Sequence, residues 1–127
     1  MHSNNGLTIK FLTYSFNDAD EYQEQIVNDF NNYAKEQNLD ITIHKTTLTT
    51  LNSSDHVDNY EAFVEAKLKK KSQDYDIFLI DNIYSNRFAE DVNDLSKYLS
   101  NEIIDKYTNI NLKTGYVGEK LITLVSF

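Results

Sequence analysis

Residues Tyr75 to Leu99 read YDIFLIDNIYSNRFAEDVNDLSKYL, and their pattern is the main guide to the fold. The apolar run in this stretch, Ile77–Ile80, is short, continuous and bounded by polar residues. This pattern is typical of a strand that is buried on both faces of a parallel sheet. The run ends abruptly at Asp81, and short helices are predicted after it, near Asn86–Asp91 and Ser100–Tyr107.

Upstream of this stretch, the chain predicts a strand and then a helix. In Leu7–Tyr14, apolar residues alternate with threonine and lysine, which indicates a strand. Asp18 and Glu21 have the spacing of a capping box that opens a helix. We expect this helix to reach about Gln37, with Asn38 as its C-cap. Its apolar residues recur at helical spacing: Tyr22, Ile26, Val27, Phe30, Tyr33 and Ala34.

A second strand and a second helix follow. Leu39–Thr46 alternates again and predicts a strand, whereas Thr47–Ser54 is polar and is expected to be a loop. Asp58–Lys71 predicts an amphipathic helix. Its expected buried face is marked by Tyr60, Phe63, Val64, Lys67 and Leu68.

The last predicted element is a strand over Lys120–Phe127, after a turn bracketed by Gly115 and Gly118. The alternation of strands and helices predicts an α/β fold of three layers, with a mostly parallel sheet and right-handed crossovers. We expect residues 1–127 to form a single domain, with residues 1–6 as a flexible leader. Because the chain ends on a strand without a polar tail, we expect it to be a fragment of a longer protein.

Composition and charge exclude several classes of function. The net charge of −8 argues against nucleic acid as a partner. The chain contains no cysteine, so it has neither disulfides nor thiolate metal ligands. No run approaches the roughly 18 apolar residues of a membrane span, and the first residues do not form a signal peptide. Either the protein stays inside the cell or a signal was removed.

Two loops qualify as a ligand site, because open α/β sheets bind ligands at the carboxyl ends of their strands. One loop follows the first strand and the other follows the third. Both mix aromatic residues with amides and carboxylates, which can stack on sugar rings and hydrogen-bond their hydroxyls. The candidate contacts are Phe16, Asn17, Asp18, Asp81, Asn82, Tyr84 and Arg87. The alternative is structural: Asp81 caps the next helix and Tyr84 packs against its own lobe.

No residue pattern in the chain predicts catalysis, a cofactor or a metal. The first strand–helix turn has no glycine, so a dinucleotide or P-loop site is not expected. The acidic cluster at 17–21 resembles the start of a calcium loop but lacks its glycine and its distal glutamate. The three histidines have no metal-like spacing, and we expect them at the surface: His2, His44 and His56. The basic run from Lys67 to Lys71 suits a helix C-terminus.

Several short segments resemble the extracellular solute-binding proteins of family 1, the sugar-binding proteins of ABC transporters. The segments occur in the family's order. They are Phe30 in the first helix, Asp58-Asn59-Tyr60, Asp81, Tyr84, Phe88-Ala89, Asp94-Leu95-Ser96 and Gly118-Glu119-Lys120-Leu121. The resemblance covers about Leu7 to Leu124, the first third of a typical member. The chain departs from the family at Tyr84, where tryptophan is common, and at its last strand, which lacks the usual proline and polar loop.

The resemblance implies a periplasmic-binding-protein-like lobe that is incomplete and not an enzyme. It implies that the parent binds a sugar or another polar solute between two lobes and delivers it to a membrane transporter, outside the cell or in the periplasm. The second lobe is missing, so we expect weak binding by this chain alone. We expect the last strand to be an unpaired edge that invites homodimers. Three alternatives stay open: an ectodomain of a larger eukaryotic receptor-like protein, a small α/β enzyme, and a domain that binds nothing.

Overall fold

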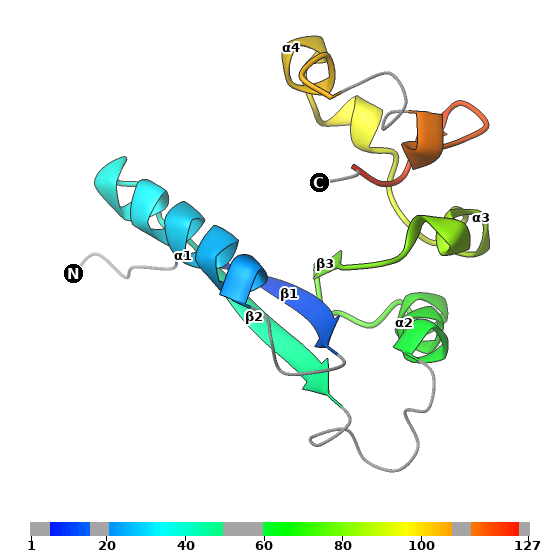
Figure 1. Ribbon diagram of the computed structural model, residues 1–127, viewed down its shortest axis with the longest axis horizontal. Helices are drawn as coiled ribbons and strands as arrows, with labels where there is room; N and C mark the ends of the chain where they lie inside the picture. The colour runs from blue at the N-terminus through cyan, green and yellow to red at the C-terminus, as the bar shows by residue number, and fades with distance from the viewer. Residues whose placement is uncertain (1–5, 16–20, 50–59, 108–112, 125–127) are drawn as a thin grey trace. The chain divides into compact units, whose positions relative to one another are not determined.

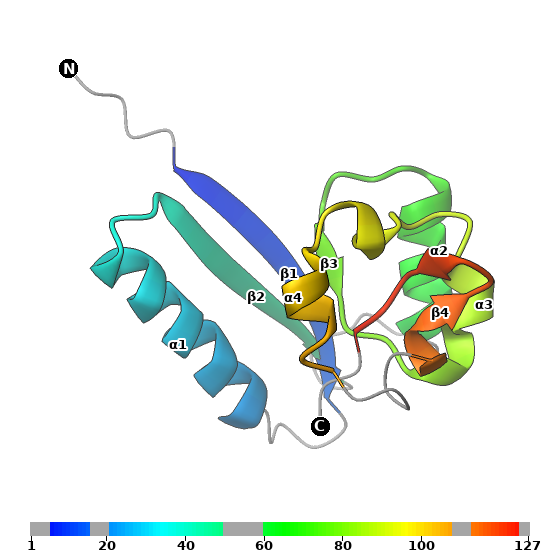
Figure 2. The same ribbon diagram turned by 90° about the horizontal axis from the view of Figure 1, so that it is seen from above.

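The computed structural model describes residues 6–15, 21–49, 60–107 and 113–124. Figures 1 and 2 show the chain as a ribbon and label its α-helices and most of its strands. The elements in chain order, with η for a short 3-10 helix, are β1 (Leu7–Ser15), α1 (Glu21–Glu36), β2 (Ile41–Thr49), α2 (Tyr60–Lys69), β3 (Ile77–Phe78), η1 (Asn82–Tyr84), α3 (Ser85–Phe88), η2 (Leu95–Lys97), α4 (Asn101–Ile104), β4 (Tyr116–Val117) and β5 (Lys120–Leu121). The chain divides into two compact units. We call Met1–Val64 with Ser72–Leu79 the sheet unit, and Glu65–Lys71 with Ile80–Phe127 the hairpin unit.

The sheet unit contains a parallel sheet of three strands in the order β2-β1-β3. β1 and β2 pair over nine residues, from Leu7 opposite Ile41 to Ser15 opposite Thr49. β3 is much shorter and pairs with β1 only at Phe11 and Leu12. The α/β class and the parallel sheet predicted from the sequence are therefore confirmed.

The strand that is buried on both faces is β1. Leu12 and Thr13 are consecutive, so their side chains point to opposite faces of the sheet, and both have 0% exposure. The sequence placed this kind of burial at Ile77–Ile80, and that prediction is wrong. The strand there is only Ile77–Phe78, and Ile77 and Leu79 are 46% and 37% exposed. An apolar run indicates a strand but not its position in the sheet, and β1 lies between two neighbours.

β2 is longer than the sequence predicted. The expected loop began at Thr47, whereas the strand continues to Thr49. The reason is that threonine is β-branched and suits a strand as well as a turn. The Thr47 hydroxyl also lies 2.9 Å from the Thr13 hydroxyl of the neighbouring strand, which stabilises the pairing.

Helix α1 lies along β2, as Figures 1 and 2 show, and buries Val27 and Ala34. Its C-terminus is a Schellman motif, because the Leu39 N–H donates to the Ala34 carbonyl over 2.8 Å and the Asn38 N–H donates to the Lys35 carbonyl. Asn38 has φ 55°, which asparagine tolerates, so the predicted C-cap is confirmed. The predicted capping box at Asp18 lies outside the described residues.

The hairpin unit has a core that includes Phe88, Ile104, Leu121 and Ile122, which are at most 9% exposed. Two short helices form close to where the sequence predicted them, as α3 and α4. The Ser100 hydroxyl caps α4 by accepting the Ile103 N–H.

The predicted last strand, Lys120–Phe127, is wrong in length and in pairing. β5 covers only Lys120–Leu121 and pairs antiparallel with β4. Gly118, with φ 62°, reverses the chain between the two strands, and this left-handed conformation suits glycine. The long unpaired strand on which we based the expected homodimer is therefore not formed over residues 120–124, and residues 125–127 lie outside the described part.

Candidate functional site

The sequence predicted seven contact residues, and the structure describes four of them. Phe16, Asn17 and Asp18 lie outside the described residues. Asp81, Asn82, Tyr84 and Arg87 all belong to the hairpin unit and follow β3 within a few residues. The structure thus brings the third-strand residues together on η1 and α3, and it does not test their pairing with the first loop.

Asp81 is exposed and acts as the N-cap of η1. Its carboxylate oxygen Oδ1 accepts a hydrogen bond from the Ile83 N–H over 3.2 Å. The structural interpretation of Asp81 from the sequence is thus confirmed, since the side chain holds the first turn after the sheet. Asn82, which follows it, is half-buried.

Tyr84 and Arg87 both lie against the buried ring of Phe88. The Tyr84 ring centroid is 6.5 Å from that of Phe88, and the Arg87 guanidinium carbon lies 5.9 Å from the Phe88 centroid. The Arg87 Nε–H also donates a hydrogen bond to the carboxylate of Glu65 on α2, and a terminal guanidinium nitrogen forms an ion pair with the same carboxylate. Both charged side chains are more than 30% exposed, so this is a surface ion pair that orients the guanidinium and adds little stability.

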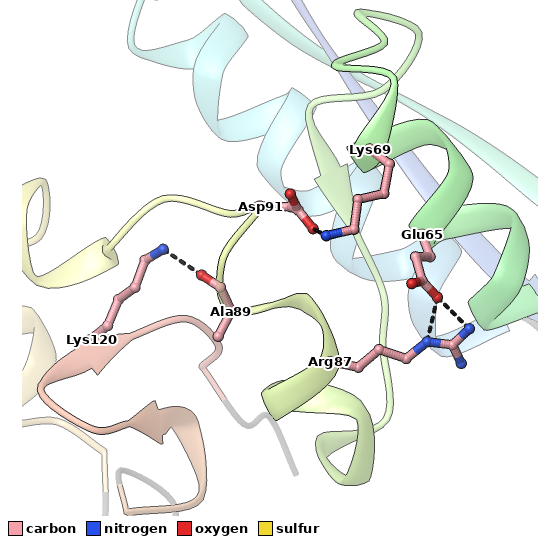
Figure 3. A network of polar contacts seen from close by, with 6 residues as sticks. All are labelled: Glu65, Lys69, Arg87, Ala89, Asp91 and Lys120. Atoms are coloured by element: carbon pink, nitrogen blue, oxygen red, sulfur yellow. Dashed lines mark hydrogen bonds and ion pairs between the residues drawn. The ribbon is translucent and has the colours of Figure 1, made fainter.

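Glu65 is the residue near this site that the sequence analysis missed. It lies in a predicted helix, 22 positions before Arg87, and nothing in the spacing links the two residues. Figure 3 shows the pair beside two further contacts of the hairpin unit. Lys69 pairs with Asp91 over 2.8 Å, and the Lys120 ammonium donates to the Ala89 carbonyl. The hydrogen bond and the charge of Asp91 raise the pKa of Lys69.

Asp94 organises the end of the hairpin unit. Its Oδ1 accepts hydrogen bonds from the Ser96 N–H, from the Ser96 hydroxyl over 2.6 Å, and from the Leu121 N–H over 3.1 Å. The hydroxyl bond is the main cause of a lowered pKa for the Asp94 carboxyl. Asp94 thus ties η2 to β5 across 27 positions of sequence.

Several of the residues on which the family resemblance rests therefore stabilise the hairpin unit. Asp81 caps η1, and the Ala89 carbonyl accepts a hydrogen bond from the Lys120 ammonium. The Asp94 carboxylate hydrogen-bonds both Ser96 and Leu121. Phe88 and Leu121, at 1% and 0% exposure, fill the core. At these positions, the resemblance therefore rests on residues that build the fold. Whether the exposed side chains contact a ligand needs a separate test.

In the sheet unit, Tyr60 links the interior of β1 to the residue that follows β3. Its hydroxyl donates to the Leu79 carbonyl over 2.7 Å and lies 3.3 Å from the Leu12 carbonyl. The Tyr14 ring lies 5.3 Å from the Tyr60 ring. Burial, followed by the charges of Glu61 and Tyr75, raises the pKa of Tyr60, so the phenol stays neutral.

The described part of the chain holds no group of three or more acidic, histidine or cysteine side chains that could bind a metal ion. In the same residues, no helix has both the length and the hydropathy needed to span a membrane. The third-strand cluster instead offers an exposed carboxylate, an amide, a phenol and a guanidinium. These groups can donate and accept hydrogen bonds and present an aromatic edge, as contact with a polar molecule requires.

Comparison with known proteins shows what fold this is. No protein-family model matches the chain, and no curated protein matches it. A solved structure titled extracellular solute-binding protein family 1, from Alicyclobacillus acidocaldarius, superposes on 91% of the chain with a TM-score of 0.68 and 16% sequence identity. The match covers 27% of that protein, so the chain spans about a quarter of its length. The likeness shows that the two chains share a fold.

Proposed function

We propose that this chain is part of a non-enzymatic protein that binds a small polar solute, most specifically a sugar or an oligosaccharide. The observation that carries the proposal is the fold shared over 91% of the chain with a structure titled as a solute-binding protein. The polar and aromatic cluster after β3, in which Asp81 and Arg87 are exposed, supports it. The proposal includes a second lobe beyond this chain, a membrane transporter as partner, and a place outside the cell or in the periplasm.

In this proposal, Asp81, Asn82, Tyr84 and Arg87 contact the ligand from the third-strand loop, and Phe16, Asn17 and Asp18 contact it from the first. Asp81 has a second carboxylate oxygen that can accept a sugar hydroxyl while Oδ1 caps η1. Arg87, held by Glu65, has further N–H groups for the same purpose. The half-buried Tyr84 ring is the stacking surface.

The test is a titration of the chain, and of a longer parent that includes the rest of the protein, with a panel of oligosaccharides. Amide signals are followed by heteronuclear NMR. We expect shifts clustered at residues 14–18 and 81–87, with weaker binding by the chain alone. Tyr84→Ala should weaken binding roughly tenfold, since stacking is lost.

Tyr98→Ala is the matched control, because Tyr98 lies in the same unit and is 72% exposed. Equal loss of affinity in both variants would contradict the assigned site. Shifts confined to other parts of the chain would contradict it too. If a longer parent binds another polar solute but no sugar, the proposed class of solute-binding protein would hold and the sugar as its ligand would be rejected.

A further inference from the structure

The two sides of β1 are paired very differently at its N-terminal half. The Leu7 N–H faces β2 and donates to the Asp40 carbonyl. The Lys10 N–H faces the other side, where it donates to the Asp76 carboxylate over 2.8 Å, and the Lys10 carbonyl accepts the Asp76 N–H. Because backbone groups alternate along a strand, Thr8 presents its N–H and its carbonyl on the same side as Lys10.

β3 does not extend far enough to reach Thr8. Its pairing with β1 is limited to Phe11 and Leu12, and the Asp76 side chain ends the ladder at Lys10. In residues 6–15, 21–49, 60–107 and 113–124, no strand pairs with Thr8 on this side. A groove of about 570 Å³ lies here instead. It is lined by Leu7, Thr8, Ile9 and Lys10 of β1 and by Ser72, Gln73, Tyr75 and Asp76.

At Ile43, a side chain covers the outer edge of β2. Asn31 of α1 accepts the Ile43 N–H over 2.7 Å and donates to the Ile43 carbonyl over 3.0 Å. One amide side chain therefore makes both hydrogen bonds that a neighbouring strand would make. Among the described residues, the sheet thus has a covered edge at Ile43 and an open edge at Thr8.

We propose that the groove beside Leu7–Lys10 binds an extended peptide segment of a partner, which adds a strand to β1. An outward N–H and carbonyl from one residue match an extended main chain, and this recognition mode needs an open strand edge. Leu7, which is 59% exposed, and Ile9 offer apolar contacts on one face of such a strand. The Lys10 ammonium donates to the Gln73 carbonyl and the Asp76 carboxylate accepts the Lys10 N–H, so both charged side chains that line the groove have partners within it.

The first experiment uses amide hydrogen exchange of the chain and a blocked pentapeptide of alternating valine and threonine. In the free chain, the Thr8 amide should exchange faster than that of Ile9, which faces β2. The peptide should slow exchange at Thr8. Two further peptides carry N-methyl groups on their valines or on their threonines. Because only alternate amides of an added strand face β1, one methylated peptide should keep its affinity and the other should lose it.

Thr8→Pro removes only the outward N–H, and proline is tolerated where the N–H of a strand faces outward. We expect it to weaken peptide binding roughly tenfold, the value of about one hydrogen bond. Thr8→Val keeps the N–H and should bind as the unchanged chain does. If Thr8→Pro fails to fold, the hydrogen exchange of the unchanged chain and its binding of the two methylated peptides still test the proposal.

Four results would overturn the proposal: protection of Thr8 in the free chain, equal affinity of Thr8→Pro, equal binding of the two methylated peptides, or no binding at millimolar peptide. The first of these would mean that another segment of the chain already occupies the edge. The groove belongs to the sheet unit and the sugar contacts tested above at 81–87 belong to the hairpin unit, so the two proposals fail independently.

Discussion

Tyr60 illustrates how one hydroxyl can link two neighbouring stretches of a sheet. It is 7% exposed and donates to Leu79, the residue after β3, while lying close to the Leu12 carbonyl within β1. Replacing it with phenylalanine keeps the ring contact with Tyr14 and removes the hydrogen bond. We expect Tyr60→Phe to lower the free energy of unfolding by about 1–2 kcal/mol, measured by urea denaturation. Tyr22→Phe, on an exposed residue of α1, is the control.

The raised pKa of Tyr60 adds a dependence on pH. The contribution of this phenol to stability is fully present below pH 10, the ordinary value, and is lost as the pH rises from there toward the higher folded-state pKa. The unfolded chain releases its proton first, and this costs about 1.4 kcal/mol per pH unit. The decline above pH 10 should be shallower in Tyr60→Phe. Equal slopes in the two proteins would show that the hydroxyl is not buried as described.

At the scale of elements, α1 protects the edge of β2 through Asn31. We expect Asn31→Ala to lower the free energy of unfolding by about 1–3 kcal/mol, because both hydrogen bonds to Ile43 are lost. The freed edge should also pair with another copy, which sedimentation velocity would detect as self-association that increases with concentration. Asn32→Ala is the matched control, since it brings the same gain in helix propensity at an exposed position. If Asn31→Ala and Asn32→Ala were equally stable and both monomeric, Asn31 would not protect the edge of β2.

The elements that the sequence predicted well are those set by neighbours in the chain. The Asn38 cap follows from its own residue type, and the buried face of α2 follows from the helical spacing of its apolar residues. The features that it missed depend on residues far apart. Asn31 reaches Ile43, and Arg87 reaches Glu65, only because the fold brings them together. The same limit explains why an apolar run at Ile77–Ile80 did not reveal that β1 is the buried strand.

Across the whole molecule, the two compact units allow stability to be probed separately. Asp94 ties the hairpin unit through Ser96 and Leu121, and its pKa is lowered. Its contribution is present above the ordinary value of 3.8 and is lost as the pH falls through the lower folded-state pKa. We expect acid to reduce hydrogen-exchange protection at residues 94–107 and 113–124 before that at residues 7–15. Asp94→Ala should show this pattern at neutral pH, with Asp105→Ala as the exposed control. Uniform loss of protection in both units would contradict it.

The amide of Asn31 has a consequence for how the protein ages. It must donate with Nδ2 and accept with Oδ1 at the same time. Deamidation would turn the donor into a second carboxylate oxygen facing the Ile43 carbonyl, so one bond would become a repulsion. Stored samples would then slowly produce molecules with an uncovered β2, without any change of gene or solvent. Mass spectrometry of the associated fraction should find aspartate at position 31 enriched there.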